Sequence, residues 1–177
     1  EARQKEAVRP QNSDTHFETL DVHLMGEKSA YEGTVLSLGG SGRVRIAQTI
    51  TLLQPETFAA LSGFSLAGGI QRADIKTNIH HIAQGTKSDQ VQKNMIGGRA
   101  IAAFRGRIRV EQSAQQTDSA QLSRTVLLSD KSRAWAVPSL EIIADDVQCA
   151  HGATVSDLPV EEMFYLQSRG LDKDLAR

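Results

Sequence analysis

Residues 138–170 read PSLEIIADDVQCAHGATVSDLPVEEMFYLQSRG, and most of what the sequence predicts about the fold depends on this stretch. An apolar strand at 140–144 runs into an acidic corner at 145–146. The segment after the corner holds Cys149, the only cysteine of the chain, and His151. Because side chains two residues apart on a strand share a face, we expect this thiol and this imidazole to lie side by side.

The composition fits one domain with a core of small side chains. Of the 177 residues, 40% are apolar and only 5% are aromatic, which suits short stacked strands better than a bulky helical bundle. The net charge of −1 gives no electrostatic reason to expect nucleic acid or an anionic membrane as a partner. No apolar run approaches the length of a membrane span. One cysteine cannot form an intrachain disulfide, so we expect a reducing compartment such as the cytoplasm.

Apolar and polar residues alternate along much of the chain before residue 138, and this pattern predicts strands. The expected strands cover 16–24, 31–38, 44–50, 64–70, 73–82 and 100–110. They recur roughly every ten to twelve residues, with polar corners between them. Residues 55–61 could form a short turn of helix. The glycine-rich run at 39–42 predicts a tight turn and not a phosphate loop, because no Lys-Ser or Lys-Thr follows it.

The segment 100–110 has the clearest alternation, and it predicts which side chains are buried. We expect four apolar side chains to point into the core, namely Ala102, Phe104, Ile108 and Val110. Arg105, Arg107 and Arg109 then share the opposite face. A stripe of three arginines could bind an anion, but a solvated strand face is the more frequent explanation.

The strand pattern leaves three architectures open, which are a sandwich, a barrel and a β-helix. A β-helix would stack its coils so that each one buries small apolar side chains against its neighbours. The glycine pairs at 39–40 and 97–98 could equally be hairpin turns, so they do not decide between the architectures.

Both ends of the chain differ from the middle. Residues 157–169 carry helix signals, with a proline and two glutamates in the first turn and an Arg-Gly pair at the end. Residues 1–15 are polar and mixed in charge, which predicts a frayed terminus. We therefore expect a core domain at 16–155 and the start of a helical region at 156–177.

Cys149 and His151 are the candidate site residues, although each also has a purely structural explanation. A small buried thiol and a histidine satisfied by a backbone carbonyl are common in protein cores. One cysteine and one histidine do not make a structural zinc site, which needs about four ligands. His80 and His81 are adjacent, so their side chains point to opposite faces of a strand and cannot chelate together.

The sequence contains no catalytic signature that we can identify, and we expect a protein that is not an enzyme. Neither the GxSxG pattern of a serine nucleophile nor the HExxH pattern of a zinc protease is present. Asp145 and Asp146 are neighbours whose side chains point apart, and we expect them to hydrogen-bond to the backbone of their own corner. The scarcity of aromatic residues argues against a carbohydrate-active β-helix enzyme.

The stretch 138–170 resembles the end of the core domain in the SufB/SufD family of iron–sulfur cluster assembly scaffolds. The resemblance rests on the pattern PxLEIxADDVxCxHGATV and on the FYLxSRG segment after it. Residues 114–121 and 127–129 fit the same family, and the similarity extends from His80 to Gly170. The CxHGATV form is typical of the SufD-type members and is absent from the SufB-type members.

This resemblance implies a right-handed parallel β-helix with a scaffold function in the SUF system. In the family a SufD-type subunit pairs with a SufB-type subunit, and a SufC-type ABC ATPase supplies energy. His151 matches the SufD position that faces a SufB cysteine across the interface, and Cys149 matches the cysteine beside it. The ATPase docks on helices after the core, and we expect a fragment that lacks most of them. The implied compartment is the cytoplasm, or the plastid stroma in a photosynthetic eukaryote.

The number of possible ligands limits how this chain could handle a cluster. An iron–sulfur cluster usually takes about four protein ligands, mostly thiolates, and this chain offers one thiolate. We therefore expect no stably bound cofactor, only a transient cluster completed by the partner chain. The alternative is a structural β-helix module in which Cys149 and His151 are inert. Without a partner, two copies could pair with each other through residues 138–155.

Overall fold

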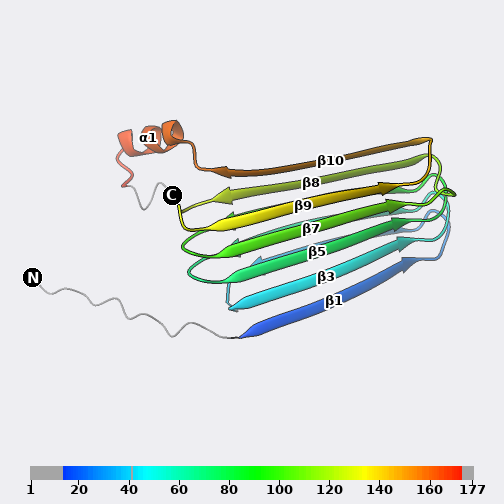
Figure 1. Ribbon diagram of the computed structural model, residues 1–177, viewed down its shortest axis with the longest axis horizontal. Coiled ribbons are helices and arrows are strands. Elements are labelled where there is room, and N and C mark those ends of the chain that lie inside the picture. The colour runs from blue at the N-terminus through cyan, green and yellow to red at the C-terminus, as the bar shows by residue number, and fades with distance from the viewer. Residues whose placement is uncertain (1–13, 41, 173–177) are drawn as a thin grey trace, which may run out of the picture.

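The described part of the chain, residues 14–40 and 42–172, coils into a parallel β-helix (Figure 1). In this computed structural model the odd-numbered strands form one five-stranded sheet, here called sheet A, and the even-numbered strands form sheet B. All paired strands run parallel. The chain alternates between the two sheets, so consecutive strands make one coil and five coils stack. The parallel β-helix that the family resemblance implied is therefore confirmed.

The strand bounds place each coil along the axis. Sheet A contains β1 (Thr15–Leu24), β3 (Arg43–Leu52), β5 (Arg72–His81), β7 (Ile101–Val110) and β9 (Arg133–Ile142). Sheet B contains β2 (Ala30–Leu38), β4 (Phe58–Ala67), β6 (Lys87–Ile96), β8 (Thr117–Leu127) and β10 (Val147–Asp157). The first coil is β1 with β2 and the last coil is β9 with β10. The β-helix thus covers 15–157, slightly more than the expected 16–155.

Four details of the predicted strand pattern are wrong. Successive strands begin 13 to 16 residues apart, and not ten to twelve. Strands β6 and β8 were not predicted, because most of their inward residues are Ser, Thr, Gln and Asn and not aliphatic ones. Residues 55–61 form no helix, since Glu56 has a φ of 56° and β4 already begins at Phe58. The predicted strand at 64–70 corresponds only to the second half of β4.

A recurring turn leads from sheet A to sheet B in the first four coils. Each turn contains one residue with a positive φ, between 56° and 66°: Lys28, Glu56, Gly85 and Gln116. The next residue is a serine or threonine whose hydroxyl donates to the carbonyl three residues earlier, at 2.7–3.1 Å. These side-chain bonds satisfy turn carbonyls that no strand partner reaches.

Three of the four turns from sheet B back to sheet A contain glycine with a positive φ, and the turn between β8 and β9 does not. Gly39 and Gly40 have φ values of 67° and 87°, so the tight turn predicted at 39–42 is confirmed for these two residues. Gly98 has a φ of 64°, and a side chain there would bring its Cβ within 2.8 Å of the backbone nitrogen of Gly69. Successive turns therefore stack backbone against backbone.

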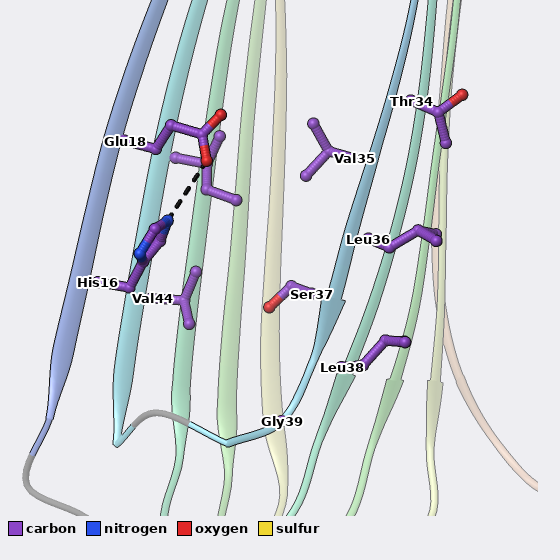
Figure 2. Close-up of a pocket in the computed structure, with 10 residues that line it drawn as sticks. His16, Glu18, Thr34, Val35, Leu36, Ser37, Leu38, Gly39 and Val44 are labelled. Atoms are coloured by element: carbon purple, nitrogen blue, oxygen red, sulfur yellow. Dashed lines mark hydrogen bonds and ion pairs between the residues drawn. The ribbon is translucent and has the colours of Figure 1, made fainter.

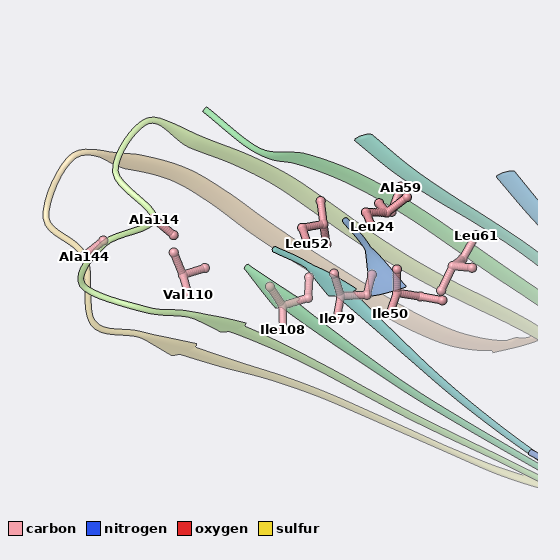
Figure 3. Close-up of a cluster of buried hydrophobic side chains, with 10 residues drawn as sticks. All are labelled: Leu24, Ile50, Leu52, Ala59, Leu61, Ile79, Ile108, Val110, Ala114 and Ala144. Atoms are coloured by element: carbon pink, nitrogen blue, oxygen red, sulfur yellow. The ribbon is translucent and has the colours of Figure 1, made fainter. Parts of the chain in front are cut away.

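The apolar core lies between the sheets and follows the predicted faces. Figure 3 shows its largest cluster, in which buried side chains from successive coils stack, including Ile50, Leu52, Ile79, Ile108 and Val110. Phe104 is 1% exposed and packs in a second cluster. The four apolar side chains predicted to point inward from 100–110 are all buried, and the three arginines point outward. The prediction of faces is therefore confirmed.

Sheet B contributes a polar lining to the same interior. The inward side chains of β6 and β8 are Ser88, Gln90, Gln92, Asn94, Thr117, Ser119, Gln121, Ser123 and Thr125, all buried. They bond mainly to one another across coils, as in the contacts from Ser88 to Ser119 at 2.7 Å and from Gln121 to Gln90 at 2.7 Å. Such contacts make the burial of polar groups tolerable.

Helix α1 (Val160–Ser168) follows the last strand and is shorter than the predicted 157–169. It begins later because β10 extends to Asp157 and Pro159 takes the N-cap position. None of its residues is buried, and Phe164 is 71% exposed. The expected fraying of 1–15 falls almost wholly on residues 1–13, outside the described residues. In the described ranges no helix has the length and apolar character needed to cross a membrane.

Candidate functional site at the last coil

The candidate residues lie on the last coil, where the stack of strands stops. Strand β10 pairs only with β8, and β9 pairs only with β7. Within the described ranges no further strand covers these two edges. Several apolar side chains of this coil are consequently exposed, among them Ile142 at 41% and Val155 at 43%. An uncovered edge with apolar side chains is suited to contact with another chain.

Cys149 and His151 share the inward face of β10, as the sequence predicted. They lie in register with Ser119 and Gln121 of β8, both of which are buried and point into the interior. Cys149 is half-buried and packs against the main apolar cluster, whereas His151 is exposed. The side chains of Cys149 and His151 therefore lie at the open end of the β-helix. The ring of His151 makes no hydrogen bond to any residue that the structure describes, so both nitrogens are accessible to a partner.

The environment of Cys149 favours the protonated thiol. Partial burial raises the pKa of this thiol, the charge of Asp118 raises it further, and a hydrogen bond from the backbone of Ser119 lowers it in part. A thiol with a raised pKa is a poor nucleophile and a poor metal ligand until something stabilises the thiolate. A metal ion or a cation supplied by a partner chain would do so.

Two unsatisfied polar atoms lie just beneath the candidate site. Gln121 Oε1 and Ser123 Oγ are buried and have no hydrogen-bond partner. They stand in register with His151 and Ala153 of the last coil. The interior directly below His151 is thus polar, and these two oxygen atoms are available to accept a hydrogen bond. The sequence analysis missed these residues, and the only signal for them was the polar alternation along 117–125.

The acidic corner before the site is held differently from the prediction. Its backbone is bonded by glutamines of the preceding coil: Gln115 Oε1 accepts from the Asp146 N–H at 2.9 Å, and the Gln116 N–H donates to the Asp146 carbonyl at 2.6 Å. The Asp145 carboxylate accepts from Gln112 at 3.4 Å. The expected bonds from these carboxylates to their own corner are not formed, because the neighbouring turn already supplies the partners.

The other histidines of the described chain lie away from the last coil. His80 and His81 point to opposite faces of β5, as predicted. His80 lies 2.7 Å from Glu111 on the outer surface. His81 is fully buried, bonds to Thr86 and Ser88 at 2.8 and 2.9 Å, and has its pKa lowered to about 4, by burial and then by the charge of His80. Among the described residues no three Cys, His, Asp or Glu side chains are grouped as a metal site would require.

In the part of the chain that the structure describes, the opposite end of the β-helix is also open, and Figure 2 shows it as a hollow lined by the first coil. His16 and Glu18 of β1 project into this hollow, and Val35 and Ser37 reach it from β2. His16 Nε2 lies 3.3 Å from Glu18 Oε2. The histidine at this end is therefore already paired with a carboxylate, and no cysteine accompanies it.

Comparison with known proteins identifies the family of this chain. The family described as SUF system FeS cluster assembly, SufBD core domain, matches residues 4–177. Protein ABCI7, chloroplastic, of Arabidopsis thaliana is 37% identical over 176 residues, which is 98% of this chain and 36% of that protein. The iron–sulfur cluster assembly protein SufD of Escherichia coli is 34% identical over 164 residues, 92% of this chain and 38% of that protein.

A third relative extends the comparison to cyanobacteria. An iron–sulfur cluster assembly SufBD family protein of Synechocystis is 33% identical over 169 residues, which is 96% of this chain and 37% of that protein. The chain thus spans little more than a third of the length of these curated relatives. The names of the Escherichia coli and Synechocystis relatives describe iron–sulfur cluster assembly, and none of the three names states a catalysed reaction. By its sequence, this chain belongs to the SufBD core-domain family of the SUF system for iron–sulfur cluster assembly.

Proposed function

We propose that this chain is a scaffold subunit that pairs through its last coil with a SufB-type subunit and offers His151 to a nascent iron–sulfur cluster. The observation that carries the proposal is the position of Cys149 and His151 together on the inward face of an uncovered terminal coil. The cluster is cargo, built at the interface and handed on. The subunit works in the cytoplasm or the plastid stroma and is not an enzyme.

The donor set suits shared and temporary ligation. One half-buried thiol and one accessible imidazole are too few to hold a cluster, which usually takes about four protein ligands. The remaining ligands must come from the partner, so the cluster forms only when both chains are in place. Ligation by imidazole in place of thiolate would leave the cluster less tightly held and easier to release.

Energy for the cycle must come from another subunit in this proposal. A SufC-type ABC ATPase would supply it by acting on helices that follow the core in the family. Helix α1 carries exposed apolar side chains, including Val160 at 83% and Phe164 at 71%, which is consistent with further packing against such helices.

A specific observation favours a reduced role for Cys149. Burial and the Asp118 charge raise the pKa of this thiol, and its side chain packs with Leu140 and Val147 against the core. These features are those of a packing cysteine. In this second candidate function the chain is a structural β-helix module, and the last coil mediates assembly without ligating the cluster.

The experiment that separates the two candidates uses His151→Ala in a cell that lacks the subunit, with the variant complex purified alongside. We expect an intact complex with an unchanged melting temperature and no cluster formation. The matched control is His16→Ala, which removes the histidine from the opposite open end and should leave cluster formation unchanged. Cys149→Ala should be milder than His151→Ala if the thiol only assists. A fully active His151→Ala complex would remove the ligand role, and an unassembled one would make His151 structural.

A further inference from the structure

The outer face of sheet A divides its arginines into two groups, and the first group is fully paired. Arg45 and Arg105 contact the carboxylate of Asp74 at 3.0 and 3.2 Å. Arg107 pairs with Glu141, and Arg109 contacts Glu111 at 2.7 Å and Glu141 at 3.5 Å. The pKa of Glu111 is lowered by hydrogen bonds from His80 and then from Arg109. Each of these guanidinium groups therefore already has its anion within the chain.

The second group lies at the start of the sheet A strands. It contains Arg43, Arg72 and Arg99, here called the arginine triplet, and also Arg133 of β9, which is in register with Ile101. All three members of the triplet are exposed, and none makes an ion pair or side-chain hydrogen bond with a residue in the described ranges. Arg43 and Arg72 are direct partners in the parallel ladder of β3 and β5, where side chains stand about 5 Å apart. Like charges at such positions destabilise a sheet unless something neutralises them.

The third member of the triplet is placed by a backbone contact. The N–H of Arg99 donates to the Gly69 carbonyl at 2.6 Å, and Gly98 lies directly on the Gly69 turn of the coil before. This stacking brings Arg99 beside Ile70, which is two residues before Arg72. The backbone position of Arg99 is therefore fixed by the contact between the two stacked turns.

The triplet lines a shallow depression of about 670 Å³ at the start of the sheet A strands. Ile70 and Ile101 form its apolar part. Asp74 follows Arg72 by two residues on the same face, but its carboxylate contacts Arg45 and Arg105. Asp14 is also close, since its backbone carbonyl accepts from the Arg43 N–H at 3.1 Å. Its carboxylate makes no ion pair with the triplet in the described structure. The depression thus combines three uncompensated cations with two isoleucine side chains.

We propose that the arginine triplet binds a small, multiply charged phosphate compound. Guanidinium groups match phosphate oxygens with paired hydrogen bonds, and three of them can surround a polyphosphate that carries several oxygens. The two isoleucines would receive an organic portion of the ligand. The triplet spans only three neighbouring coils, which is too short for the many phosphate contacts of a nucleic acid. This site lies on the outer face of sheet A and is independent of the function proposed for the last coil.

The test is calorimetric titration of the chain with sodium pyrophosphate at constant ionic strength. We expect saturable binding that Arg72→Gln weakens by about tenfold or more. The matched control is Arg105→Gln, which removes the same charge from the same sheet face but takes it from an ion pair with Asp74. We expect this control to bind pyrophosphate as the unmodified chain does, within about twofold. Circular dichroism of both variants verifies the fold.

Three results would overturn the proposal. One is no pyrophosphate binding by the unmodified chain at millimolar concentration. Another is equal weakening in Arg72→Gln and Arg105→Gln, which would show that only net charge matters. The last is binding of a polyglutamate peptide through the triplet with none of pyrophosphate, which would identify an acidic polypeptide as the partner. Complementation by Arg72→Gln is a separate readout, so failure of this site does not affect the scaffold proposal.

Discussion

The two ends of this β-helix are alike in fold and unlike in chemistry. At the first coil, His16 faces the interior of the stack but lies 3.3 Å from the Glu18 carboxylate. At the last coil, His151 faces the interior with Cys149 beside it and bonds to no described residue. Within residues 14–40 and 42–172 no strand pairs with the outer edges of either end, so the fold alone does not distinguish them.

The difference between the ends shows where the function resides. A histidine held by a carboxylate has one ring nitrogen engaged, whereas an unengaged imidazole beside a thiol can accept metal or a proton from a partner. At one end of the same architecture the histidine is already paired with a carboxylate of this chain. At the other end the histidine has no such partner among the described residues and lies beside a thiol. Function follows from those few side chains and not from the stacking of coils.

The largest expected effect tests the middle of the stack against its first coil. Phe104 on β7 is 1% exposed, and Phe17 on β1 is 64% exposed. Phe104→Ala should reduce the free energy of unfolding by about 3–5 kcal/mol, because it leaves a cavity. Phe17→Ala should change it by less than about 0.5 kcal/mol. Urea titration followed by circular dichroism gives both values, and similar losses would mean that the first coil is covered in solution.

The second prediction tests which end associates. Val155→Asp on β10 should weaken binding to a SufB-type partner by about a hundredfold, because it buries a charge at the proposed interface. Phe17→Asp on β1 places the same charge at an exposed apolar site of the other end and should leave binding unchanged. Light scattering of the isolated chain provides a second readout, since a pair of identical chains would dissociate only with Val155→Asp. Weakening by Phe17→Asp alone would reverse the assignment of the ends.

Much of the fold could be predicted from residues whose pattern is local. The alternation over 100–110 identified the buried face of β7, because most of the inward side chains there are apolar and pack in the core clusters. Strands β6 and β8 escaped detection because their inward side chains are polar and are satisfied by contacts one coil away. A repeat signal was nevertheless present, since a serine or threonine occupies the same turn position at 29, 57, 86 and 117.

The candidate site was predictable in one respect and not in another. That Cys149 and His151 share a face follows from strand geometry alone. Their exposure through an open end depends on β10 being the last strand of its sheet, which no local pattern contains. The unsatisfied Gln121 and Ser123 below them depend on register between residues about thirty positions apart. Such register becomes visible only once the coils are stacked.

The third prediction contrasts the buried His81 with the exposed His16. The pKa of His81 falls from 6.5 to about 4 on folding, so the unfolded chain binds the proton more tightly. The resulting stability is fully present above pH 6.5 and is lost as the pH falls toward 4. Between pH 7 and pH 5 the free energy of unfolding should drop by about 2 kcal/mol. His81→Asn should reduce this pH dependence while His16→Ala leaves it unchanged, and a pH-independent urea midpoint in the unmodified chain would contradict the prediction.

The smallest expected effect concerns the thiol at the open end. Because burial and the Asp118 charge raise the pKa of Cys149, the thiolate fraction at neutral pH is reduced, and iodoacetamide should react with it more slowly than with a free cysteine. Asp118→Asn should speed alkylation at pH 7 by about two- to fivefold, since it removes a nearby negative charge. Asp89→Asn removes the same charge one coil further from the thiol and should have little effect. If the SufB-type partner supplies a cation or a metal ion at this end, adding the partner should change the alkylation rate of Cys149 in the unmodified chain. This change should be far larger than the change caused by Asp118→Asn. A rate that responds equally to Asp118→Asn and Asp89→Asn would show that long-range charge, and not the local environment of the last coil, controls this thiol.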